Sequence, residues 1–115
     1  NNLAGIYRTR GDYAKAEPLD KRSLAIREKT LGPDHPDVAV SLNNLAETYR
    51  IQGDYAKAEP LYKRSLAIWE KALGPNHPSV ATSLGNLAAL YRDTKRNKEA
   101  EALAQRAAKI RAIKR

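Results

Sequence analysis

The sequence contains no cysteine and no methionine. Without cysteine the chain can form neither a disulfide nor a thiolate metal site, and this fits a reducing compartment, so we expect a cytoplasmic protein. No apolar run approaches the length of about 18 residues that suggests a membrane-spanning helix, so we expect no membrane contact. Because the chain also starts inside a repeated unit, the missing methionine suggests a piece of a longer protein.

Signatures of catalysis are missing as well. There is no glycine-rich phosphate loop, and a Ser-His-Asp set could be assembled only by repeating it in each unit. His35 and His77 recur at the same loop position of successive units, where stacked helices would hold them about 10 Å apart, too far to share an ion. We therefore expect no enzyme, no cofactor and no metal site.

The chain is instead repetitive. The stretch GDYAKAEPL occurs at residues 11–19 and again at residues 53–61, and thirty-two of the forty-two residues in 1–42 are identical in 43–84. A third, degraded copy carries GNLAALYRD and then EAEALAQRA. A fixed period of this length indicates an array of stacked units. We predict one domain over residues 1–115, with a partial repeat at 1–31, a second repeat at 32–73, and a third at 74–115 that ends in a capping helix.

Each complete unit is predicted to form two helices. In the breaker cluster GPDHPDV at 32–38, Pro36 suits a first helical turn, with Asp34 or His35 as the cap. The first helix should run from about Pro36 to about Gln52. Its apolar residues share one face because their spacing follows the helical period: Val38, Leu42, Leu45, Ala46 and Tyr49.

A turn then leads into the second helix, from about Tyr55 to about Leu73. Gly53 is expected to stop the first helix in the left-handed backbone region, and Asp54 to cap the second through its side chain. In the third copy Lys95 and Arg96 replace this pair. We expect Lys95 to take the same backbone conformation at a cost of about 1 kcal/mol, and Asn97 to cap the last helix.

The stretch LNNLAETYRIQGDYAKAEPLYKRSLAI at 42–68 resembles the tetratricopeptide repeat, in the forty-two-residue form of the kinesin light chain. The matching residues are Leu45, Ala46, Tyr49, Gly53, Tyr55, Ala58, Tyr62 and Ser65. The resemblance implies an all-α fold, a right-handed superhelical solenoid of stacked antiparallel helix pairs. It places the first helix of each pair on the concave side and the second on the convex side. It also implies a scaffold that binds other proteins.

A polar stripe lies opposite the apolar face of each first helix, and the resemblance places it in the concave groove. Arginine suits carboxylates and asparagine suits an extended peptide backbone, so we expect an acidic extended segment of another protein to bind here. The resemblance adds that the kinesin light chain groove takes peptides rich in acidic residues around an aromatic. The predicted groove residues are Asn1, Asn2, Arg8, Asn43, Asn44, Glu47, Arg50, Asn86 and Arg92.

Three other uses of the chain stay open. The asparagines could bond one another across neighbouring helices, and the arginines could pair with Glu47 or Asp93, which leaves an array that only sets spacing. The net charge of +8 and a basic convex side favour weak nucleic-acid binding, although the tyrosines that would stack on bases fall at core positions. The incomplete first unit should leave an apolar edge through which copies self-associate. The basic residues of the convex side are Lys15, Lys21, Arg22, Lys57, Lys63 and Arg64.

Trp69 is expected to be a packing residue that stays partly exposed to solvent.

Overall fold

A computed structural model describes residues 2–113, except for the side chains of Asn2 and Ala4. Over these residues the chain forms six α-helices and no strand. None of the helices described is both long and apolar enough to cross a membrane. The helices are α1 (Asn2–Thr9), α2 (Tyr13–Leu31), α3 (Pro36–Ile51), α4 (Tyr55–Leu73), α5 (Pro78–Asp93) and α6 (Asn97–Ile113).

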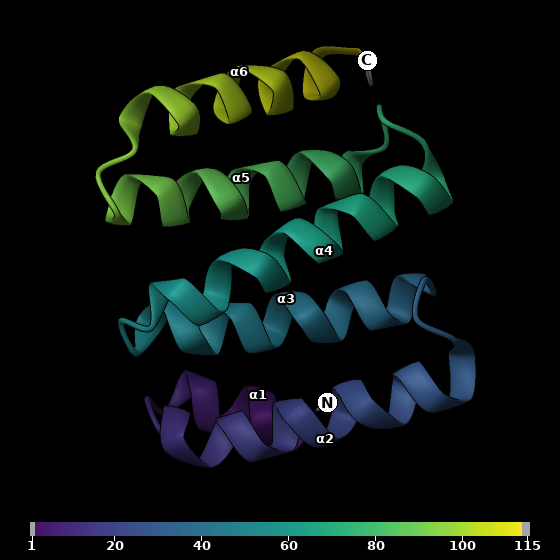
Figure 1. Cartoon of the computed structure of the whole chain (residues 1–115), viewed down its shortest axis with the longest axis vertical. Helices are drawn as coiled ribbons and strands as arrows, with labels where there is room; N and C mark the ends of the chain where they lie inside the picture. The colour runs from purple at the N-terminus through teal and green to yellow at the C-terminus, as the bar shows by residue number, and fades with distance from the viewer. Residues whose placement is uncertain (1, 114–115) are drawn as a thin grey trace.

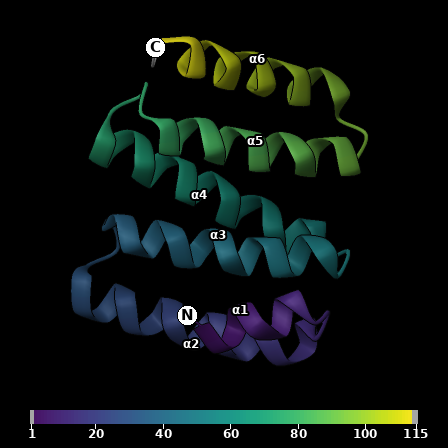
Figure 2. The same ribbon diagram turned by 180° about the vertical axis from the view of Figure 1, so that it is seen from behind.

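The helices stack one after another along the longest axis of the molecule, with α1 and α2 at one end and α6 at the other (Figures 1 and 2). Each helix packs mainly against the one before and the one after it in the chain. Such nearest-neighbour packing defines a solenoid, in which no helix pair has a complete core of its own. The fold is the all-α solenoid of antiparallel helix pairs that the repeats predicted.

The core runs across repeat boundaries. Leu42 is fully buried with Val38 and Ala39 of α3 against Ile68 of α4. A larger cluster joins α3, α4, α5 and α6. All five predicted core residues of α3 are buried, which confirms the periodicity argument. The members of the larger cluster are Leu45, Ala46, Tyr49, Ala58, Tyr62, Leu87, Ala88, Leu90, Tyr91 and Ala100.

Histidine caps the first helix of each complete repeat. The Nδ1 atom of His35 accepts a hydrogen bond of 3.0 Å from the Asp37 N–H, and His77 does the same for the Ser79 N–H. Of the two caps considered for α3, His35 is therefore the one used, while Asp34 lies 3.4 Å from Lys71. These bonds account for the recurrence of histidine at this position.

The turn into the second helix differs in part from the prediction. Gly53 has the expected left-handed backbone, with φ of 83°. The expected side-chain cap by Asp54 is wrong: its carboxylate bonds no backbone N–H of α4 and lies 3.6 Å from Lys57. At φ −92° and ψ 67° the backbone of Asp54 lies outside the extended region in which a cap side chain reaches back to the helix. Its N–H instead bonds the Tyr49 carbonyl at 2.8 Å.

Lys95 reproduces this turn without glycine. Its φ is 63°, as expected, and the Arg96 N–H bonds the Tyr91 carbonyl at 2.7 Å in the same pattern as Asp54 and Tyr49. The expected cap by Asn97 is wrong, because Asn97 is already the first residue of α6. The Arg96 carbonyl accepts the bond from Ala100 at 3.0 Å, so Arg96 holds the capping position.

Candidate functional site

Helices α3 and α5, the first helices of the two complete repeats, are joined by two polar contacts. The Asn86 Nδ2 donates to the Asn43 Oδ1 at 3.0 Å, and Arg50 pairs with Asp93 at 2.9 Å. Both contacts join residues 43 positions apart, one more than the repeat length. Asn86 therefore bonds Asn43 and not Asn44, the residue at the equivalent position of the preceding repeat. The reason is that successive first helices meet with an offset of one residue.

A cleft of about 200 Å³ opens between these two helices. Amide and hydroxyl groups line its sides, and Val40 and Trp69 supply apolar surface. We call it the α3–α5 cleft. Three of the predicted groove asparagines, Asn43, Asn44 and Asn86, are among its lining residues: Val40, Asn43, Asn44, Trp69, Ser79, Thr82, Ser83 and Asn86.

Trp69 reaches this cleft from α4 and is half-buried. It packs against the apolar cluster around Leu42 and against the one around Leu84, so it also holds the two repeats together. Trp69 is the partly exposed packing residue that was expected, but its position at the groove was not predicted. The signal was available: Trp69 stands where the other copies have Arg27 and Arg111.

The equivalent position between α2 and α3 is occupied by a charge. The Arg27 guanidinium donates to the Asp37 carbonyl at 3.1 Å and to the Ser41 hydroxyl at 2.9 Å. The two inter-repeat positions of the chain are therefore chemically different despite the near-identity of the copies.

Arg8, one of the predicted groove residues, is bonded within the chain. It bonds both carboxylate oxygens of Asp20, at 2.6 and 2.8 Å, and Asp20 also accepts from the Thr48 hydroxyl at 2.9 Å. Arg8 is 15% exposed and Asp20 only 2%. With the one-residue offset, the residue of α3 that would face Arg8 is Ile51, which cannot accept a hydrogen bond from a guanidinium. Asp20 was not among the predicted site residues, although it is one of the ten positions that differ between the first two copies.

Two arginines remain on the first-helix face. Partial burial lowers the pKa of Arg50, but its interactions with Asp93 and the Tyr62 hydroxyl outweigh this and leave the pKa raised. Arg92 is exposed, and no carboxylate of the described residues lies within ion-pair distance of it. Glu47 is half-buried on the same face. Asn1 and the side chain of Asn2 lie outside the described residues.

Four of the six basic residues predicted for the convex side have acidic partners. Lys21 lies 3.0 Å from Glu17, Lys63 lies 2.8 Å from Glu59, and Arg64 lies 2.6 Å from Glu28. Lys57 pairs with Asp54, and Lys15 lies over the ring of Tyr7. These pairs reduce the positive charge that this side offers to a nucleic-acid backbone.

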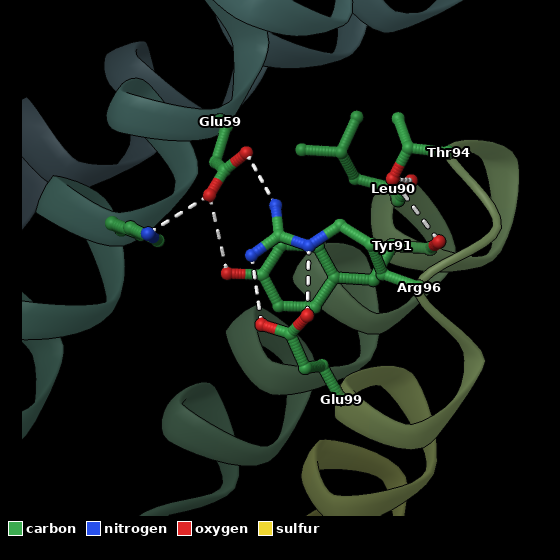
Figure 3. A network of polar contacts seen from close by, with 7 residues as sticks. Glu59, Leu90, Tyr91, Thr94, Arg96 and Glu99 are labelled. Carbon is green, nitrogen blue, oxygen red and sulfur yellow. Dashed lines mark hydrogen bonds and ion pairs between the residues drawn. The ribbon is translucent and has the colours of Figure 1, made fainter.

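A polar network fastens the last turn to the preceding repeat (Figure 3). Arg96 bonds Glu59 of α4 at 2.8 Å and Glu99 of α6 at 2.9 and 2.7 Å. Its guanidinium lies 4.0 Å from the centre of the Tyr91 ring, and the Tyr91 hydroxyl bonds Glu59 at 3.3 Å. The substitution that removed the usual turn residues thus introduced a link between repeats.

Replacing Arg96 with alanine is expected to lower the melting temperature at pH 7, and by less in acid. Lys63 and then Arg96 lower the pKa of Glu59 against the opposing effect of burial, and Arg96 lowers that of Glu99. A carboxylate with a lowered folded-state pKa stabilises the fold above its unfolded pKa of about 4.3, and the contribution is lost as the pH falls through the folded value. Thermal melts followed by circular dichroism at pH 7, 4 and 2.5 measure the difference. Arg22→Ala, at an exposed arginine, is the control, and a difference that stays constant with pH contradicts the expectation.

Comparison with known proteins places the chain in a family. A model of the tetratricopeptide repeat matches residues 1–71 and again residues 41–112. The chain belongs to the tetratricopeptide repeat family, whose members are in general non-catalytic scaffolds for protein–protein interaction. Within that family, the solved structures that it resembles are kinesin light chain-like.

Two crystal structures illustrate the similarity. A kinesin light chain-type protein of Podosopora anserina with nearly identical TPR-like repeats is 32% identical, with a TM-score of 0.88 over 96% of this chain and 53% of that one. BtubC (BKLC) of P. vanneervenii is 30% identical, with a TM-score of 0.90 over 98% of this chain and 45% of that one. The chain thus spans about half the length of the proteins it matches.

Proposed function

We propose that the chain is a protein-binding scaffold that holds an acidic, extended segment of another protein against α3 and α5, and that it carries out no catalysis. The observation that carries this proposal is the α3–α5 cleft, where amide groups, hydroxyls and one indole meet, with Arg50 and Arg92 further along the same two helices. A cleft with an apolar floor and a few convergent polar groups is the usual form of a binding site.

The charge of the face favours an acidic partner. Arg92 is open to solvent, and the ion pair of Arg50 with Asp93 is partly exposed on both sides. Such pairs contribute well under about 1 kcal/mol, so a carboxylate of a ligand can replace Asp93 at small cost. The net charge of +8 attracts an acidic segment from a distance as well.

The polar groups of the cleft suit an extended backbone. Asn44 and Asn86 lie on opposite sides of the cleft, and each side-chain amide offers donors and an acceptor. An extended peptide exposes its own donors and acceptors at intervals of about 3.3 Å per residue, with alternate side chains on opposite sides. One side chain of such a peptide can then rest on Trp69, and acidic residues several positions further along can reach Arg50 and Arg92, which lie about two helical turns beyond Asn43 and Asn86.

Replacing Arg50 and Arg92 together with alanine is expected to weaken acidic peptides by about tenfold or more, because a charge-assisted contact contributes about 1.5 kcal/mol or more. The measurement is selection of peptides from a random display library on the immobilised chain, followed by titration of the selected peptides. The matched control is Lys57→Ala with Arg22→Ala, which removes the same charge from the second helices. Arg8 is left intact because it is bonded to Asp20.

Four results would contradict the proposal. Selected peptides without acidic residues, or equal weakening by the control variant, would remove the groove assignment. Binding of a random oligonucleotide that falls steeply with salt, without peptide selection, would favour nucleic acid instead. No binding of either kind would leave an array that sets spacing.

Self-association through the α1 edge stays a prediction. Leu3 and Ile6 are about half exposed on α1, whereas the residues at the same positions of α3, Leu45 and Thr48, are buried. The exposed apolar area favours contact between copies.

A further inference from the structure

Glu47 is a half-buried carboxylate on the face of α3 that also carries Asn43 and Arg50. Among residues 2–113, no basic group lies within ion-pair distance of it, and its side chain makes no hydrogen bond. A charge that has lost part of its water without gaining a partner is unfavourable. A cation supplied from outside the chain would therefore be stabilised at this position.

The repeats differ at this position. Where α3 has Glu47, the other two copies have Gly5 and Ala89. Ala89 is the equivalent residue on α5, and its methyl group can neither pair with a carboxylate nor cover it. Two of the three copies form the same helix without an acid here, so the carboxylate is particular to this place in the array and is not a requirement of the repeat.

Arg50 lies about one turn further along α3, and its guanidinium is directed to α5. It pairs with Asp93 at 2.9 Å and also interacts with the Tyr62 hydroxyl. In the first repeat the equivalent arginine, Arg8, is neutralised by Asp20, but Tyr62 stands at that position in the second repeat. Because a phenol carries no charge at neutral pH, Asp93 takes the place of that carboxylate.

The charges around Tyr62 leave one negative charge in excess. The ring is 3% exposed, and burial raises the pKa of its hydroxyl. Arg50 opposes this rise in pKa, whereas the charges of Glu47 and Asp93 add to it. The two carboxylates therefore act on the same spot, with one guanidinium to offset them. A second cation would balance the charge.

We infer that Glu47 selects a lysine or arginine side chain of the bound segment. Along α3 it lies about one turn beyond Asn44 of the α3–α5 cleft and about one turn before Arg50. Alternate residues of an extended segment lie on one side, about 6.6 Å apart. The matching order is an apolar residue on Trp69, a basic residue at Glu47, and then acidic residues, each two positions from the last. The assignment rests on the proposed function and narrows its ligand to a segment of mixed charge.

The probe is a display library of random peptides, selected on the immobilised parent chain and in parallel on Glu47→Gln and Glu47→Lys. We expect lysine or arginine to be enriched at one position of the parent's peptides. Glu47→Gln should abolish that enrichment, and Glu47→Lys should replace it with aspartate or glutamate, because the charge at the site is removed or reversed. Acidic residues elsewhere in the peptides should persist in all three selections, since Arg50 and Arg92 are unchanged.

Titration of a selected parent peptide by fluorescence anisotropy measures the size of the effect. Glu47→Gln should weaken it about fivefold, between the effect of an exposed ion pair and that of a buried charge-assisted bond. Changing the basic residue of the peptide to glutamine should cost the same, and the two changes together should cost no more than either alone. The matched control is Glu101→Gln, at an exposed carboxylate of α6, which should bind as the parent does. Thermal melts should show the parent's melting temperature for both variants.

Each outcome separates this assignment from the proposed function. Acidic peptides without an enriched basic position, equal binding by Glu47→Gln, or equal weakening by Glu101→Gln would overturn the role of Glu47 and leave the acidic partner in place. Peptides with a basic position that depends on Glu47, but without acidic residues, would support that role and remove the acidic partner. Failure to select any peptide on the parent chain would overturn both.

Discussion

Replacing Leu42 with alanine is expected to lower the free energy of unfolding by about 3 kcal/mol. Leu42 is fully buried between α3 and α4, where it contacts the cluster of Val38, Ala39 and Ile68. Removing a buried leucine side chain to alanine costs about 2 to 5 kcal/mol, since apolar contact is lost and a cavity remains. Domains of this size have a total stability of about 5 to 15 kcal/mol, so the change removes a large part of it.

Urea unfolding followed by circular dichroism measures this effect, with the slope of the transition as a check that the unfolded state is unchanged. The matched control is Val40→Ala, two residues earlier on the same helix but exposed to solvent. It should change stability by no more than about 0.5 kcal/mol. Leu84→Ala, at the equivalent buried position of α5, should cost about as much as Leu42→Ala. A cost below about 1 kcal/mol at both leucines would contradict the shared core.

Replacing Asp20 with alanine is the second substitution with a large expected effect, a loss of about 2 kcal/mol. The carboxylate accepts from the Arg8 guanidinium and from the Thr48 hydroxyl, and Thr48 has no solvent exposure. Its removal leaves Arg8 without that acceptor, at about 1 to 3 kcal/mol for an unsatisfied buried group, whereas the Thr48 hydroxyl can still donate to the Asn44 carbonyl at 3.2 Å. Because Arg8 is 15% exposed and can turn toward water, we expect the middle of that range and not the cost of a fully buried unpaired charge.

The control for Asp20 is Asp34→Ala, which removes an aspartate from an exposed pair with Lys71 and should cost less than about 0.5 kcal/mol. A double variant separates pairing from packing. If the loss arises because Arg8 has no acceptor, Asp20→Leu combined with Arg8→Leu should recover part of the stability lost in Asp20→Ala. A double variant at least as unstable as the sum of the single changes would show that the pair itself has little part in the loss.

The helices and the core were predictable from sequence because their causes are local. The spacing of Val38, Leu42, Leu45 and Tyr49 defines one face of a helix, and the glycines define the turns. The polar contacts were not predictable in the same way, since they depend on how neighbouring helices are offset. The partner of Asn86 is Asn43 and not Asn44 for this reason.

The incorrect caps have a similar origin. Asp54 has the residue type of a cap, but the left-handed Gly53 before it sets a backbone direction that keeps its carboxylate away from the helix. Arg96 was expected only to remove the cap that Asp54 would provide. Its bond to Glu59 was not predictable, because that bond depends on α4 lying beside the turn. The role of Asp20 was not predictable from the sequence, because only the packing of α1 and α3 beside it brings Arg8 and Thr48 within bonding distance. Asp20 and Arg27 form contacts between the first and second repeats, whereas Trp69 packs between the second and third. These differing positions therefore make the two junctions between repeats chemically different.

The one-residue offset between first helices gives the array a direction. Asn43 and Arg50 lie on the side of α3 that faces α5, where they contact Asn86 and Asp93. The two flanks of such a helix are chemically unlike, so the surface is not the same when traversed backwards. A peptide bound across α3 and α5 should therefore adopt one chain polarity only, and a peptide with the reversed sequence should not substitute for it.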